Sequence, residues 1–279
     1  MRTNSMDEIQ VQGTSVPALG LGTWQLTGPS CTETVKSALE MGYRHIDTAQ
    51  AYDNERQVGL GIEAATVDRE DVFLTTKLDG SNRDERSVRR STRESLNKLG
   101  TDYLDLLLIH WPNTPWMASL SETLGAMNDL VEEGLVRHIG VSNFSPSLLD
   151  RARTMSSAPI FTDQVQYHPY WDQRKLLDYC RIHDVLLTAY SPLARGGVLD
   201  DPALVQIGNR YGKSSAQVAL RWLVQQEGVA AIPKASSRKH LEANMAIFDF
   251  ELTDAEMERI RDPSKVKTGV QFVRSQLPF

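Results

Sequence analysis

The feature that most constrains the fold is a regular alternation of short β-rich runs with stretches of helical apolar spacing. Eight runs recur, and after each one apolar residues return at steps of three and four. The predicted strands are Ala18–Thr23, His45–Thr48, Val72–Thr76, Leu104–Ile109, His138–Val141, Asp163–Tyr167, Leu186–Tyr190 and Ala230–Pro233. Some of these runs are apolar without alternation, which is typical of parallel strands covered on both faces.

Helix-start signals lie between the predicted strands. Capping boxes are predicted at Ser30–Glu33, Ser119–Glu122 and Thr253–Glu256, with a glutamine variant at Ser214–Gln217. Ser145 and Asp201 each precede a proline, which suits the first position of a helix. Two short extended segments, Ile9–Gln12 and Ser15–Pro17, come before the first repeat and predict a β-hairpin.

The repeats run without a linker or a compositional break. Eight strand–helix units of this kind favour a closed parallel (β/α)8 barrel, the TIM barrel, over a doubly wound sheet. We therefore predict an α/β chain that forms a single barrel domain over residues 1–279, with a short N-terminal hairpin.

Charge and cysteine content exclude several classes of protein. The formal net charge is −6, which argues against a surface for nucleic acid or an anionic membrane. The first residues are polar, and no apolar run approaches the length of a membrane span. The only cysteines, Cys31 and Cys180, offer no disulfide framework. These features predict a cytoplasmic protein, and the absence of a marked apolar stripe favours a monomer.

Barrel enzymes carry their active sites at the carboxyl ends of the strands, so the residues that end each predicted strand are the first candidates for catalysis. Asp47, Tyr52, Lys77 and His110 lie at or just after the ends of three consecutive predicted strands. A lysine ammonium beside a tyrosine favours the phenolate and brings the phenol pKa toward the working range. A carboxylate would hold that lysine, and a neutral histidine can orient a carbonyl oxygen. Such a set suits proton donation to a carbonyl substrate.

The chain resembles the aldo-keto reductase family over nearly its whole length. The segments that carry the resemblance are GLGTW (Gly20–Trp24), GYRHIDTAQAYDNE (Gly42–Glu55), LDLLLIHWP (Leu104–Pro112), IGVSNF (Ile139–Phe144), DQVQYHPY (Asp163–Tyr170), TAYSPL (Thr188–Leu193), IPKASS (Ile232–Ser237) and FDFELT (Phe248–Thr253). Within the family, the chain is most similar to the small prokaryotic members that reduce 2,5-diketo-D-gluconate, methylglyoxal and similar carbonyls. The resemblance implies hydride transfer from NADPH to an aldehyde or ketone.

The resemblance also implies residue roles. Catalysis would fall to a tetrad of Tyr52, Lys77, Asp47 and His110, with Tyr52 as the proton donor. The nicotinamide would contact Tyr190, Ser142, Asn143 and Gln164, and the pyrophosphate would contact Ser191 and Leu193. The adenosine 2′-phosphate and adenine would lie near Lys234, Ser236, His240, Glu242 and Asn244. The substrate pocket would be walled by Trp24, Trp111 and Trp116.

Two departures bear on cofactor choice. Ala235 stands where NADP-preferring relatives usually carry serine, and His240 stands where they usually carry an arginine. Neither alanine nor histidine can form the bidentate hydrogen bonds that an arginine guanidinium makes to a phosphate. The resemblance implies NADPH, and these residues leave NADH open as an alternative.

Two other classes of protein compete with a reductase. His45, Asp47, His110 and His168 lie near strand ends, where metal-dependent barrel hydrolases bind zinc. That alternative leaves Lys77 and Tyr52 unexplained, and we predict no metal. The other alternative is a catalytically idle cofactor-binding subunit, which has no use for a tuned phenol.

Overall fold

The computed structural model describes residues 7–114 and 116–261. Its strands are β1 (Glu8–Val11), β2 (Thr14–Pro17), β3 (Leu21–Gly22), β4 (His45–Asp47), β5 (Phe73–Leu78), β6 (Leu104–Ile109), β7 (Val136–Ser142), β8 (Ile160–Gln166), β9 (Leu186–Tyr190) and β10 (Val229–Ala231). Its α-helices are α1 (Gly28–Glu40), α2 (Glu55–Glu63), α3 (Glu85–Leu99), α4 (Leu120–Glu132), α5 (Pro146–Met155), α6 (Arg174–Ile182), α7 (Pro202–Tyr211), α8 (Ser215–Val224), α9 (Arg238–Met245) and α10 (Asp254–Arg261). The 3-10 helices are η1 (Gln50–Tyr52), η2 (Arg69–Asp71) and η3 (Ala194–Gly196).

Strands β3 to β10 form one parallel sheet in sequence order, and its two edges meet. Gly20 N donates to Ala231 O and Ala231 N donates to Ala18 O, each at 2.8 Å, so the sheet closes into a barrel. The two edges come very close at Gly22, where a Cβ would lie 2.6 Å from Ile232 O. Only glycine fits this approach. The predicted (β/α)8 fold is confirmed.

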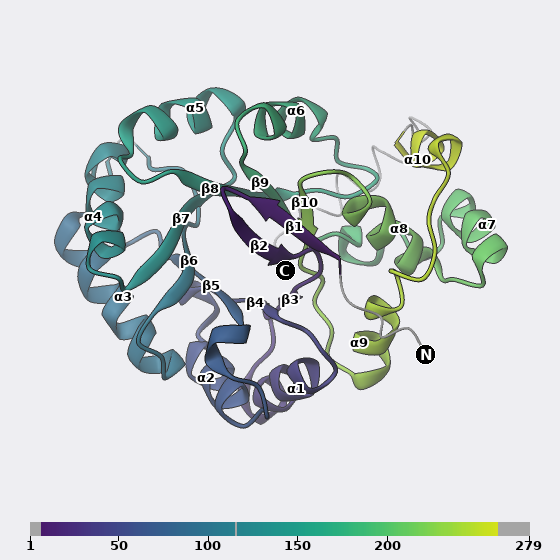
Figure 1. Cartoon of the computed structure of the whole chain (residues 1–279), viewed down its shortest axis with the longest axis horizontal. Coiled ribbons are helices and arrows are strands. Elements are labelled where there is room, and N and C mark those ends of the chain that lie inside the picture. The colour runs from purple at the N-terminus through teal and green to yellow at the C-terminus, as the bar shows by residue number, and fades with distance from the viewer. Residues whose placement is uncertain (1–6, 115, 262–279) are drawn as a thin grey trace.

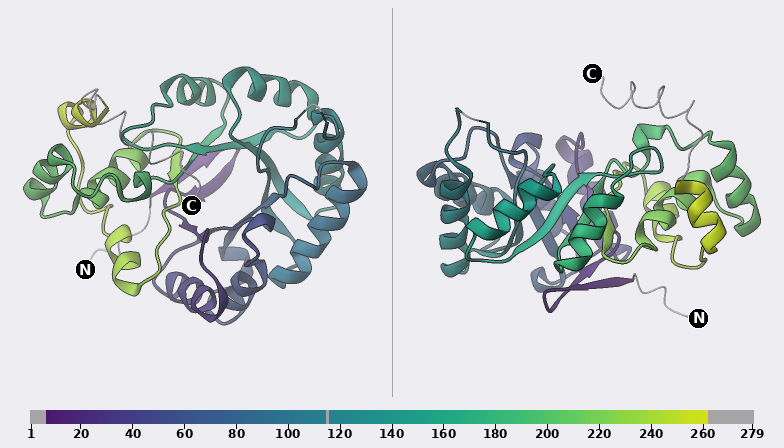
Figure 2. Two further views of the ribbon diagram at one scale, coloured as in Figure 1. Left: turned by 180° about the vertical axis from the view of Figure 1, so that it is seen from behind. Right: turned by 90° about the horizontal axis from the view of Figure 1, so that it is seen from above.

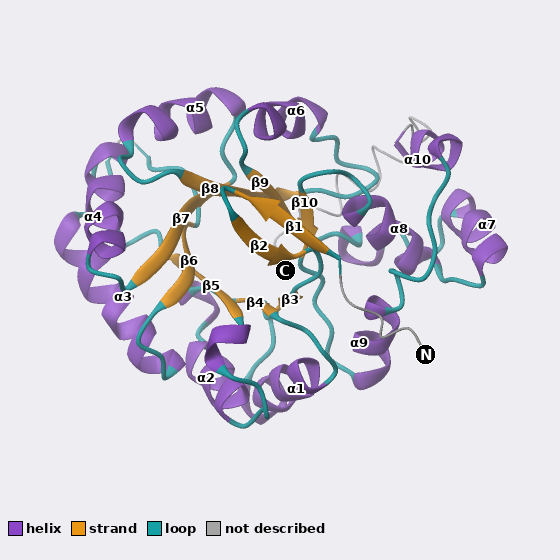
Figure 3. Ribbon diagram, in the orientation of Figure 1, coloured by secondary structure: helices purple, strands orange, loops and turns teal. Residues whose placement is uncertain are grey.

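Helices cover the outside of the barrel, as Figures 1 and 3 show. Apolar faces of these helices pack on the strands in one continuous core that includes Leu74, Leu107, Ile139 and Trp222. Among the described residues, no helix combines the length and the apolar character needed to cross a membrane.

The N-terminal hairpin, β1 and β2, lies at one end of the barrel (Figure 2). Gln12 Nε2 donates to Ile160 O at 3.1 Å, at the first residue of β8, so the hairpin covers the amino ends of the strands. Val11 and Val16 pack on barrel residues such as Phe161. With this end covered, the opposite end remains for ligands.

Most local predictions are confirmed, but two of the predicted capping boxes are wrong. The hairpin and all eight barrel strands occur, although β3 is only Leu21–Gly22 and β7 begins at Val136, because pairing with neighbours sets the strand limits. The helix predicted to start at Ser30 instead starts at Gly28 after Thr27, with Pro29 in its first turn. Ser30 Oγ donates to Thr27 O, and Glu122 Oε1 accepts from Glu85 N and not from Ser119 N. Capping boxes therefore form at Ser214 and Thr253 but not at Ser30 or Ser119.

Candidate active site

The four predicted catalytic residues gather at the carboxyl end of the barrel. Asp47 is the last residue of β4, Tyr52 ends the short helix η1, and His110 directly follows β6. Lys77 lies inside β5, one residue before its end, whereas the sequence placed it just after the strand. Parallel neighbouring strands bring these side chains, distant in sequence, to one edge.

Lys77 is the centre of the group, and it is 0% exposed. Its Nζ donates to Asp47 Oδ1 at 2.5 Å, to Thr48 O at 2.7 Å and to the Tyr52 hydroxyl oxygen at 3.4 Å. An ammonium has three N–H donors, so these acceptors satisfy it completely. A buried charge of this kind persists only when it is paired and hydrogen-bonded. Because Tyr52 accepts from Lys77, the phenol proton remains to be donated to another group.

Burial and charge oppose each other at Lys77 and at Tyr52. Burial alone would lower the pKa of Lys77, but the charges and hydrogen bonds of Asp47 and Tyr52 raise it above its ordinary value. Burial raises the pKa of Tyr52, and the Lys77 ammonium acts in the opposite direction. The sequence prediction had the sign of the Lys77 effect right, but the net direction for Tyr52 is upward. Tyr52 therefore carries its proton at neutral pH.

His110 stands beside Tyr52 as a neutral imidazole. The two rings meet edge to face, with centroids 5.8 Å apart. Burial and then the nearby Lys77 charge lower the pKa of His110 to about 4. At neutral pH this histidine can thus donate one hydrogen bond without adding a charge to the site.

The residues predicted to hold the nicotinamide join the same network. Gln164 Nε2 donates to Asp47 Oδ2 at 2.7 Å, and Ser142 Oγ donates to Gln164 O at 2.7 Å. Tyr190, the last residue of β9, donates to Asn143 Oδ1 at 2.8 Å. The structure therefore brings these four residues to the edge that carries Lys77, where hydrogen bonds link them to one another and Gln164 links them to Asp47.

The residues predicted to contact the rest of the cofactor lie on the segments after β9 and β10. Ser191 follows β9 with φ +48°, and Lys234 is exposed after β10, with its Nζ 3.5 Å from Gln25 Oε1. On α9, His240 is exposed, whereas Asn244 is buried. Three further members of this set are placed as follows: Leu193 is half-buried, Ser236 is exposed, and Glu242 is exposed and accepts from Arg238 at 2.9 Å.

The predicted tryptophan wall is unevenly covered. Trp24 is 37% exposed, Trp111 is 55% exposed and Trp116 is 85% exposed. Trp111 follows His110 and stacks on its ring at 6.4 Å between centroids. Arg195 lies 5.6 Å above the Trp24 ring, so the segment after β9 reaches the segment after β3. Ring contacts therefore hold Trp24 and Trp111 in place, whereas Trp116 is the most exposed of the three and the least suited to wall a pocket.

Two residues near the site escaped the sequence prediction. Thr48 supplies a backbone oxygen to Lys77, and no side-chain type signals such a contact. Arg83, in the segment between β5 and α3, is 2% exposed and donates from Nη2 to Trp111 O at 3.2 Å. The sequence predicts that an arginine in a polar segment is exposed, so only the fold reveals its burial.

The residues of the hydrolase alternative do not assemble into a metal site. Among residues 7–114 and 116–261, no group of three or more His, Cys, Asp and Glu side chains is arranged to hold a metal ion. His45 is buried in the barrel and packs edge to face on Phe73. The donor arrangement therefore gives the hydrolase alternative no support.

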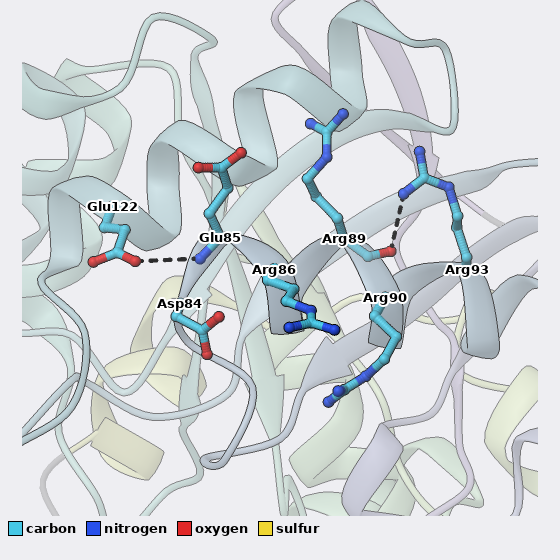
Figure 4. A pocket seen from close by; sticks show the side chains of 7 residues that line it. All are labelled: Asp84, Glu85, Arg86, Arg89, Arg90, Arg93 and Glu122. Carbon is cyan, nitrogen blue, oxygen red and sulfur yellow. Dashed lines mark hydrogen bonds between the residues drawn. The ribbon is translucent and has the colours of Figure 1, made fainter.

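A surface pocket is lined by a different set of residues (Figure 4). It runs along α3 with one residue of α4, and its lining residues are Asp84, Glu85, Arg86, Arg89, Arg90, Arg93 and Glu122. Two of the arginines, Arg89 and Arg93, pair with Glu133. The pocket holds none of the predicted site residues, and its charges largely neutralise one another.

Comparisons with known proteins agree with the geometry. Residues 18–264 match the model of the aldo/keto reductase family. The chain is 39% identical to glyoxal reductase of Bacillus subtilis, over 93% of this chain and 94% of that protein. A crystal structure of a candidate 2,5-diketo-D-gluconic acid reductase B shares 45% identity with a TM-score of 0.90, over 92% of this chain and 91% of that one. A Bombyx mori aldo-keto reductase in complex with NADP shares 35% identity with a TM-score of 0.86, over 92% of each chain.

Proposed function

Since the chain belongs to the aldo/keto reductase family, we propose that its buried cluster reduces small aldehydes and ketones, with Tyr52 as the proton donor. The observation that carries this proposal is the Lys77 ammonium, which bridges Asp47 Oδ1 at 2.5 Å and the Tyr52 hydroxyl at 3.4 Å. A fully buried cation that points at a phenol has no evident structural use. It does have a catalytic use, because it stabilises the phenolate that proton donation leaves.

In this mechanism the carbonyl oxygen lies between the Tyr52 hydroxyl and the His110 ring. His110 donates a hydrogen bond that orients and polarises the carbonyl, and Tyr52 transfers its proton to the oxygen. Lys77 stabilises the resulting phenolate, while Asp47 keeps Lys77 in place. Bound NADPH supplies the hydride that the carbonyl carbon receives.

The residues at the barrel mouth fit a nicotinamide dinucleotide. The half-buried Tyr190 ring offers an apolar face, the Gln164 amide lies on the neighbouring strand β8, and the Asn143 amide, just after β7, accepts from the Tyr190 hydroxyl. The exposed Lys234 ammonium and Ser236 hydroxyl would bind the 2′-phosphate. Ala235 is 2% exposed and cannot contribute a hydroxyl there, so Lys234 carries most of the discrimination against NADH.

Lys234→Ala is expected to weaken NADPH binding about tenfold and to leave NADH binding unchanged, because one charge-assisted contact is lost. Fluorescence titration with both cofactors measures this difference. Lys175→Ala, an exposed lysine on α6, serves as the matched control. Equal losses for both cofactors would show that Lys234 does not bind the 2′-phosphate.

Small dicarbonyls and keto sugars are the substrates we propose, and methylglyoxal is the first to try. The support is the half-open wall, with Trp24 at 37% and Trp111 at 55% exposure, together with the relatives named for glyoxal and diketogluconate. Consumption of NADPH that depends on methylglyoxal supports the proposal. A protein that binds NADPH but consumes none with any carbonyl would instead be the idle subunit.

We further propose that residues 1–279 act as a single domain and as a monomer in the cytoplasm. The barrel strands share one closed sheet, and Cys31 and Cys180 are both free and buried. The large apolar side chains that are exposed, such as Leu60, Met155 and Val205, come from separate helices. Light scattering on the purified protein tests the monomer.

A further inference from the structure

The Arg83 guanidinium is buried, yet few of its donors are used. Its Nη2 donates to Trp111 O, whereas Nε and Nη1 are buried without a hydrogen-bond partner among the described residues. Burying a cation under these conditions is destabilising. An uncharged amide could join the two segments as well, so the positive charge itself calls for an explanation.

Arg83 acts on the turn that carries His110. Two successive carbonyls at the end of β6 each accept a side-chain hydrogen bond, His110 O from Asn143 Nδ2 at 3.1 Å and Trp111 O from Arg83 Nη2 at 3.2 Å. Thr123 Oγ1 of α4 donates to Arg83 O at 2.7 Å, which fixes the segment that bears the arginine. Arg83 is therefore fixed at its backbone by Thr123 and at its guanidinium by the backbone oxygen of the residue that follows His110.

Charged groups face His110 from three directions. Lys77 lies on β5, Asp47 lies at the end of β4, and Asp79 and Arg83 lie on the segment between β5 and α3. After burial, the Lys77 charge is the next cause of the low His110 pKa; Arg83 acts in the same direction, and the two aspartates oppose it.

We propose that Arg83 is a positioning residue that holds the His110–Trp111 turn and keeps His110 a neutral hydrogen-bond donor to the carbonyl. The proposal rests on the role of His110 given above. It adds a residue outside the predicted tetrad and assigns its charge, rather than its hydrogen bond alone, to the reaction.

Two substitutions separate charge from hydrogen bonding. Arg83→Gln keeps a hydrogen-bond donor for Trp111 O and removes the positive charge. Arg83→Lys keeps the positive charge and loses the planar guanidinium. Removing a cation favours the imidazolium, so the His110 pKa in Arg83→Gln should rise from about 4 by about half a unit to one unit. In Arg83→Lys it should stay near the wild-type value.

NMR titration of the imidazole signals measures the His110 pKa in each variant without any enzyme assay. The chain has six histidines, and His110→Asn identifies the signal of His110. Arg86→Gln, an exposed arginine on α3, is the control and should leave the titration unchanged. If Arg83→Gln does not fold, Arg83→Lys and Asp79→Asn still test the idea, because the latter removes an opposing charge and should lower the His110 pKa.

The pH profile of kcat/KM links the titration to the reaction. The acid limb of Arg83→Gln should move to higher pH by the same amount, while KM for NADPH does not change. Unchanged titration in Arg83→Gln, or equal shifts in Arg83→Gln and Arg83→Lys, would overturn the proposal. A wild-type protein that turns over no carbonyl would contradict the proposed function but would leave the titration of His110 interpretable.

Discussion

Tyr52→Phe is expected to lower kcat by about 10²–10⁴-fold, the range that general acid catalysis contributes. The phenol proton is the one that Lys77 leaves available, and phenylalanine has none to give. The substitution preserves the ring that meets His110 edge to face, so the pocket keeps its shape. Steady-state kinetics with methylglyoxal, together with NADPH titration, measures the effect. Cofactor affinity should be unchanged.

A matched control is Tyr103→Phe, which removes a hydroxyl that donates to Arg69 O at 3.4 Å, just before β6 begins and far from the catalytic edge. That variant should keep full activity. Retention of wild-type kcat in Tyr52→Phe would remove Tyr52 from the mechanism. A fall confined to NADPH affinity would make Tyr52 a binding residue instead.

Lys77→Met is expected to abolish turnover and to lower the free energy of unfolding by about 3–5 kcal/mol. The reason is that Asp47 would stay buried, with Gln164 as its remaining side-chain donor. Chemical denaturation measures the stability loss, and kinetics with the same sample measures activity.

The double variant Asp47→Asn with Lys77→Met separates the two effects. Removing both charges of a buried pair is often neutral for stability, so most of the unfolding free energy should return. Activity should not return, because no ammonium stabilises the Tyr52 phenolate. Recovery of turnover in the double variant would contradict the role given to Lys77.

The sequence predicted the barrel because its signals are local and repeated. Each strand is a short β-rich run, and N-cap residues such as Ser145 and Asp201 mark the start of the next helix. The predicted helix start at Ser30 was wrong because Thr27 and Pro29 begin the same helix earlier. Where two helix-start signals of similar strength lie close together, packing determines which residue caps the helix. The sequence pattern does not describe packing.

The candidate site was predictable where chemistry and position coincide, at residues that close strands. Asp47, Lys77 and His110 could be paired because consecutive parallel strands end at one edge. The net pKa direction of Tyr52 could not be predicted, because it depends on how far burial outweighs the Lys77 charge. Arg83 was missed for a related reason, since its burial arises from the segment that Thr123 holds in place.

The most direct test of a reductase centred on Tyr52 follows the hydride itself. Purified protein is mixed with methylglyoxal and NADPH that carries deuterium at both C4 positions of the nicotinamide, and the product is examined by mass spectrometry and NMR. We predict one deuterium on the carbon of the former carbonyl for each NADPH that the wild type consumes, and about 10²–10⁴-fold slower formation of the same product by Tyr52→Phe. A product without deuterium, or wild-type protein that consumes no NADPH, would contradict the account.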